Sequence, residues 1–93
     1  MEVRSAVALA KSYVQTLFAE EGVRNITLEE VDYDEAQHAW LVTVGFSRRD
    51  PSEDGMSVLA AAIAIANEKM RINYKIVKIS DATEKVLSVK NRD

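Results

Sequence analysis

The chain is poor in the residues that most often mark catalytic and metal-binding chemistry. It has no cysteine, one histidine, one proline and three glycines among its 93 residues. Without cysteine it can form neither a disulfide nor a thiolate metal site. Cysteine usage therefore gives no sign of an oxidising or a reducing compartment. The single histidine, His38, has no Gly-x-Ser-x-Gly or similar nucleophile motif to act on. We therefore expect a protein that is not an enzyme and has no catalytic residues, metal or cofactor.

Long apolar runs and an excess of positive charge are also missing. The longest apolar run covers residues 58–66, whereas a bilayer-spanning helix needs about 20 residues. Residues 1–47 carry three basic and eight acidic side chains (−5), and residues 48–93 carry nine and seven (+2), which gives the net charge of −3. No basic patch interleaves with aromatic residues. These features disfavour a membrane-spanning protein and a nucleic-acid-binding protein.

The first residues contain no basic segment followed by an apolar one, so we expect no secretory signal. A cytoplasmic location is the default prediction. A fragment of an exported protein would have the same appearance, so this prediction does not extend to a longer chain.

The residues that are present predict one folded α+β domain, residues 1–93. Apolar residues make up 47% of the chain and charged residues 29%, which is ordinary for a globular protein. Over residues 2–21, apolar side chains recur at spacings of three and four, which predicts an amphipathic helix. Gly22 can end it in the left-handed conformation. The apolar stripe consists of Val3, Ala6, Val7, Ala10, Tyr13, Val14, Leu17 and Phe18.

Four later segments show the period of two that is typical of β-strands. In the first of them the apolar residues change phase between Leu28 and Val31, which predicts a β-bulge near residues 29–30. The strands are expected at about residues 25–33, 40–46, 72–80 and 85–91, with connecting turns at residues 34–37 and 81–84.

Residues 56–70 are harder to assign. Alanine favours a helix, which Ser57 could cap, whereas the alternation of alanine and isoleucine over residues 62–66 also suits a strand. We expect a short helix, which gives the order α-β-β-(short α)-β-β. A single small sheet cannot bury a helix that is apolar on every side. The segment is therefore either a core helix or a self-association and partner surface formed by Leu59, Ala62, Ile63, Ala66 and Met70.

These elements predict an N-terminal helix packed on a four-stranded antiparallel sheet. The helix has one apolar stripe to bury, and the sheet has one aromatic and aliphatic face to cover. We expect the helix residues Val3, Val7, Val14, Leu17 and Phe18 to contact the strand residues Trp40, Val42, Val44, Ile76 and Val86.

The last two strands resemble the closing hairpin of a known family. Residues 74–79 read Tyr-Lys-Ile-Val-Lys-Ile, a turn containing Thr83 follows, and Val86 and Leu87 come next. This is similar to PepSY-type domains, which are small α+β modules resembling peptidase propeptides and inhibitors. The run Trp-Leu-Val-Thr-Val at residues 40–44 is similar to the preceding strand of that family. The resemblance implies a role in binding or inhibiting a peptidase, or in sensing, without chemistry of its own.

Two positions depart from the family pattern. Ser80 stands in the place of an aspartate, and Glu84 in the place of a glycine. Because glycine adopts a positive φ at no steric cost, Glu84 predicts either a strained turn or a different turn geometry.

Five carboxylates gather within residues 29–35, at Glu29, Glu30, Asp32, Asp34 and Glu35. They could bind a cation or a basic partner. The Asp-x-Asp-x-Asp-Gly spacing of an oxygen-ligand calcium loop is absent, and strand alternation should send neighbouring residues to opposite faces. We favour a solvated strand edge that charge keeps soluble, and we expect no metal.

The leading interpretation is a non-enzymatic interaction domain, of inhibitory or other kind, that binds a protein or peptide partner through an exposed strand edge or through residues 56–70. Arg48 and Arg49 could clamp an anionic group of that partner, or could simply form a charged loop. A homodimer through residues 56–70 is a further hypothesis. The alternative is a small-molecule-binding domain with its ligand between helix and sheet, near Tyr13, Trp40 and Tyr74.

Overall fold

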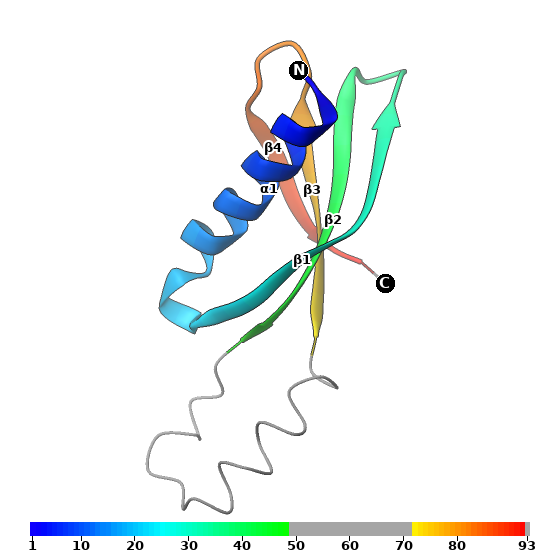
Figure 1. The fold of residues 1–93 in the computed structure, drawn as a ribbon. Coiled ribbons are helices and arrows are strands. Elements are labelled where there is room, and N and C mark those ends of the chain that lie inside the picture. The colour runs from blue at the N-terminus through cyan, green and yellow to red at the C-terminus, as the bar shows by residue number, and fades with distance from the viewer. Residues whose placement is uncertain (49–71, 93) are drawn as a thin grey trace, which may run out of the picture.

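The computed structural model describes residues 1–48 and 72–92 of the chain (Figure 1). Its elements are α1 (Val3–Leu17), a short 3-10 turn η1 (Ala19–Glu21), β1 (Val23–Asp34), β2 (Ala39–Arg48), β3 (Asn73–Ser80) and β4 (Val86–Asn91). The strands form one antiparallel sheet in the order β1-β2-β3-β4, and α1 lies across one face of it. The predicted α+β fold is confirmed. The expected short helix in residues 56–70 lies outside the described residues.

The residues that α1 buries fully against the sheet are small. Ala6, Ala10 and Val14 are fully buried and lie on the apolar stripe that the sequence predicts. The chain leaves the helix through η1, and Gly22 ends this turn with a φ of 65°. Within the described ranges, no helix combines the length and apolar character that a membrane-spanning segment needs.

Strand β1 contains the bulge that its change of phase predicts. The pairing with β2 shifts between Leu28 and Glu30, because Glu29 is an extra residue in β1. A second shift lies between Arg24 and Thr27. A third, between β3 and β4, leaves Leu87 as the extra residue. After Glu30 the ladder between β1 and β2 runs without interruption to the hairpin.

The register assigns each strand residue to one of two faces. Leu28, Val31 and Tyr33 of β1 pair with Val44, Val42 and Trp40 of β2, and these six side chains face α1. On β3 this face carries Val77 and Ile79, which are fully buried, and Lys75, whose Nζ lies 5.6 Å from the centroid of the Phe18 ring. The opposite face carries Glu30, Asp32, Leu41, Thr43, Gly45, Tyr74, Ile76 and Lys78.

Three of the expected core residues lie elsewhere. Ile76 pairs with Thr43 on the face away from α1, and its neighbours Val77 and Ile79 occupy the core instead. Val3 and Leu17, the first and last residues of α1, remain 42% and 52% exposed. The remaining seven are confirmed in contact with the core. Val14, Val42 and Val44 belong to the buried core, and Val7, Phe18, Trp40 and Val86 are partly buried and pack against it.

The turn between β3 and β4 has the strained geometry that Glu84 predicts. Glu84 has a φ of 57°, in the left-handed region where a Cβ is costly. Its N–H donates to the Ser80 carbonyl at 2.9 Å. The Ser80 hydroxyl accepts a hydrogen bond from the Thr83 N–H at 3.2 Å, so serine caps the turn with its own side-chain oxygen.

Candidate functional site

The structure describes few of the residues that the sequence analysis singled out for partner binding. Leu59, Ala62, Ile63, Ala66, Met70 and Arg49 lie outside the described residues. The backbone of Arg48 ends β2 and pairs with Val23 of β1. His38 lies in the turn between β1 and β2, where it is exposed and has a φ of 49°.

The three aromatic residues of the expected small-molecule site are not brought together. Trp40 faces α1 and packs edge-on against Tyr33, with ring centroids 4.8 Å apart. Tyr74 pairs with Gly45 on the other face of the sheet, where the Arg92 guanidinium lies 4.1 Å from its ring centroid. Tyr13 is an exposed residue of α1. A ligand therefore cannot contact all three rings in one cavity.

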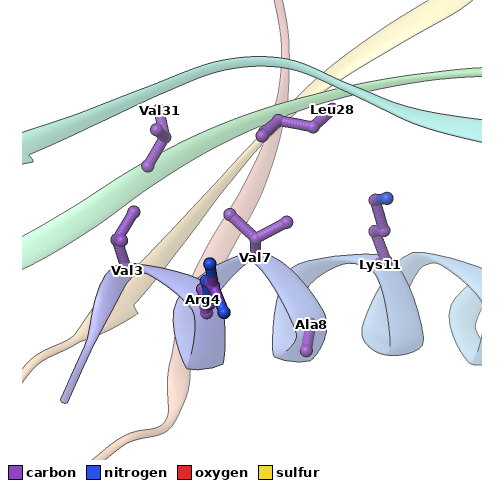
Figure 2. Close-up of a pocket in the computed structure, with 7 residues that line it drawn as sticks. All are labelled: Val3, Arg4, Val7, Ala8, Lys11, Leu28 and Val31. Carbon is purple, nitrogen blue, oxygen red and sulfur yellow. The ribbon is translucent and has the colours of Figure 1, made fainter.

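An apolar groove of about 400 Å³ lies instead between α1 and β1. In Figure 2, Val3 and Val7 point from the helix toward Val31 and Leu28 of the strand. The groove is not filled, since Leu28 and Val3 each keep 42% of their surface exposed. The bulge at Glu29 creates the strand side of the groove, because the extra residue lets Leu28 and Val31 face α1 although they are three positions apart.

Two cations border this groove. Arg4 and Lys11 line it together with Ala8, and Lys11 extends toward β1 (Figure 2). They lie seven residues apart, which is two helical turns or about 10 Å along the axis. Among the described residues neither cation makes an ion pair or a side-chain hydrogen bond, and Lys11 is half-buried. The groove therefore has apolar walls and free positive charge on the helix side.

The carboxylates of β1 lie on the other face of the sheet. Glu30 pairs with Thr43, and the Glu29 side chain lies against Gly45 and accepts a hydrogen bond from the Thr27 hydroxyl at 3.0 Å. The expectation that Glu29 and Glu30 point to opposite faces is wrong, because the bulge breaks the alternation between them. Among the described residues these carboxylates form no group that could hold a metal ion. Strand β1 thus separates a basic, apolar side from an acidic side.

The outer edge of β1 is unpaired within the described sheet, where β1 pairs only with β2. The His38 carbonyl accepts a hydrogen bond from the Asp81 N–H. Because hydrogen-bonded and non-hydrogen-bonded pairs alternate along an antiparallel ladder, the backbone N–H and C=O of Trp40 also point toward β3. Tyr33 lies opposite Trp40, so its N–H and C=O point outward, as do those of Val31. The Tyr33 N–H donates to Asp32 Oδ1 at 2.9 Å.

Beside the groove, a polar contact fixes the start of α1 to the turn between β3 and β4. Asp81 Oδ1 lies 3.1 Å from the ammonium of Met1, and Asp81 Oδ2 accepts a hydrogen bond from the Tyr33 hydroxyl at 3.0 Å. The ammonium, followed by the Tyr33 hydroxyl, holds the pKa of Asp81 below its usual 3.8. Partial removal from water, followed by the bond to Asp81, raises the pKa of Tyr33 above its usual 10.0.

Sequence reasoning missed the groove because its two sides come from elements that are distant in the chain. The sequence analysis named neither Arg4 nor Lys11 among the candidate binding residues. A usable signal was present, since both cations flank the apolar stripe at a spacing of seven and so lie on one side of it. Comparison with protein-family models, with curated proteins and with solved structures finds no match for this chain. The resemblance to PepSY-type domains stays a prediction.

Proposed function

We propose that the chain is a non-enzymatic interaction domain that binds an extended segment of a partner protein along the outer edge of β1. The observation that carries the proposal is that β1, an edge strand of 12 residues whose outer side is unpaired among the described residues, borders an unfilled apolar groove. An added strand would pair with the outward backbone groups of Val31 and Tyr33 and place alternate side chains in the groove. The PepSY-type resemblance supports the same class of function.

An apolar small molecule in the same groove is the second candidate. About 400 Å³ lies within the range of 300–1,000 Å³ that is usual for ligand sites. The two candidates differ in what they require of the backbone, because a small molecule does not need the outward amides of β1. Blocking those amides therefore separates them.

The test is selection from a library of displayed random peptides, followed by nuclear magnetic resonance of the labelled protein with the selected peptides. We expect the amide signals of Val31 and Tyr33 to shift together with the methyl signals of Val7 and Leu28. N-methylation of alternate peptide residues removes the donors that edge pairing needs and should abolish binding in one register only. Enrichment of no peptide, or shifts confined to β4, would refute the proposal.

A matched pair of variants locates the site. Leu28 and Leu87 are both exposed leucines on edge strands at a bulge, where Leu28 precedes the extra residue Glu29 and Leu87 is itself the extra residue. Of the two, only Leu28 lines the groove. Leu28→Glu should weaken binding of a selected peptide at least about tenfold, because it puts a charge where an apolar side chain should be buried. Leu87→Glu should leave binding unchanged. Equal effects of the two variants would argue against the groove.

A further inference from the structure

We infer that the side chains of the bound segment differ between its two faces. Those on the side of α1 are apolar with one acidic residue among them, and those on the other side are basic. The inference rests on the proposed function and names the chemistry of the partner. It follows from the opposite charges on the two sides of β1. The experiment that tests it can refute the charge pattern without refuting the proposed function.

The helix side of the docked segment would meet the groove. Val31 and Leu28 are apolar, and Arg4 and Lys11 are cations without an ionic partner among the described residues. A half-buried lysine next to apolar walls repels a second cation and is stabilised in its charged form by a nearby carboxylate. Valine-like side chains with one glutamate or aspartate therefore suit this side.

The other side of the docked segment would meet carboxylates. From Glu30 to Asp34 the strand is regular, so Glu30, Asp32 and Asp34 recur on the same face at every second position. A segment paired with β1 would have its alternate side chains about 5 Å from these groups. Lysine or arginine at those positions gains opposite-charge pairs, whereas acidic residues are repelled. Carboxylates alone would not define a site, but Glu30, Asp32 and Asp34 lie on the strand whose outer edge is unpaired among the described residues, on the face opposite the cationic groove.

Two peptides of identical composition test the pattern. The probe is fluorescein-Lys-Val-Lys-Val-Lys-Glu-Lys-Val-amide, which puts glutamate among the valines on one side and only lysine on the other. The control, fluorescein-Lys-Val-Lys-Val-Glu-Lys-Lys-Val-amide, exchanges one neighbouring pair, so that each side carries one misplaced charge. By fluorescence anisotropy in low salt, the probe should bind about fivefold tighter than the control, and the ratio should shrink at high salt.

Charge reversal in the protein assigns the effect to the groove. In the double variant Arg4→Glu with Lys11→Glu, the glutamate of the probe is repelled and the misplaced lysine of the control is attracted. The two peptides should then bind about equally. The double variant Lys85→Glu with Lys90→Glu makes the same charge change at the exposed β4 end of the sheet and should keep the fivefold preference. Circular dichroism checks that both double variants are folded.

The outcomes separate the inference from the proposed function. If both peptides bind the natural chain equally and shift the Val31 and Tyr33 amides, the function stands and the charge pattern is refuted. If neither peptide binds while library peptides bind at β1, the pattern is again refuted. If the preference survives Arg4→Glu with Lys11→Glu but is lost in Lys85→Glu with Lys90→Glu, the edge is β4 and the inference is wrong. If no peptide of any sequence binds, both fail.

Discussion

Asp81 is the residue through which three separate parts of the chain meet. Its carboxylate contacts the Met1 ammonium and the Tyr33 hydroxyl, and its N–H bonds to the His38 carbonyl. The Trp40 indole N–H faces the same carboxylate without reaching hydrogen-bond geometry among the described residues. Asp81 therefore connects the start of α1, the β1–β2 hairpin and the β3–β4 turn.

The stability of the protein should depend on pH through this group. Because the folded-state pKa of Asp81 is lowered, its ionised form stabilises the native state above the usual 3.8, and the contribution is lost as pH falls through the folded value. Asp81→Asn should lower the free energy of unfolding at neutral pH. The gap to the natural chain should close at acidic pH, as measured by urea denaturation at a series of pH values.

Tyr33→Phe is the control for this prediction, because it removes one hydrogen bond and keeps the carboxylate. It should give a smaller loss with the same pH trend. A gap for Asp81→Asn that stays constant from neutral to acidic pH would show that the loss comes from packing and not from charge.

Single residues were predictable from sequence where the signal is local. Glu84 in the place of a glycine indicates a strained turn, and Ser80 lies three residues before the amide that it caps. The Asp81 contacts could not be predicted, because Tyr33 lies 48 positions away in the chain. Arg4 is a similar case, since a helix pattern alone does not reveal which strand lies beside it.

At the scale of elements, β3 shows where periodicity stops being sufficient. The strand has apolar residues in both phases, with Ile76 in one and Val77 and Ile79 in the other. Sequence period alone cannot choose between two such phases, and the packing of α1 makes the choice. The bulge at Glu29 was predictable because its phase change is visible. The bulge at Leu87 has the same kind of signal, since Val86 and Val89 both pack on the core three positions apart.

Two isoleucines of β3 test the assignment of its faces. Ile79 is fully buried against α1, and Ile76 is partly exposed on the opposite face. Ile79→Ala should cost about 3 kcal/mol in free energy of unfolding, from lost burial and the cavity left behind. Ile76→Ala should cost about 1 kcal/mol, because less of its surface is buried. Chemical denaturation measures both, and a larger loss for Ile76→Ala would reverse the faces.

At the scale of the molecule, the central strands should be the most stable part of the described fold. Strands β2 and β3 are paired on both sides and supply most of the buried core, whereas β1 and β4 are edges. The fold class was predictable because one helix and four alternating strands have few ways to bury their apolar faces. The groove was not predictable from sequence, because it depends on the path that α1 takes across the sheet.

Backbone amides should exchange hydrogen most slowly in the central strands β2 and β3 and faster at the outer edges of β1 and β4. The amides of Val42 and Val44, which are bonded to β3, should exchange only on global unfolding, whereas the outward amide of Val31 should exchange rapidly. A bound peptide at the β1 edge should slow Val31 and leave Val42 unchanged. Rapid exchange throughout β2 would contradict this order of stability.

The bond between the Tyr33 N–H and the Asp32 carboxylate affects how selective the β1 edge can be. An incoming segment must replace that carboxylate with one of its own carbonyl groups, so the amide exchanges one acceptor for another and the number of hydrogen bonds at this position does not change. Backbone pairing there adds little net affinity for an arbitrary sequence. Discrimination between competing segments then rests on their side chains, and most polypeptides that meet this edge should leave it quickly.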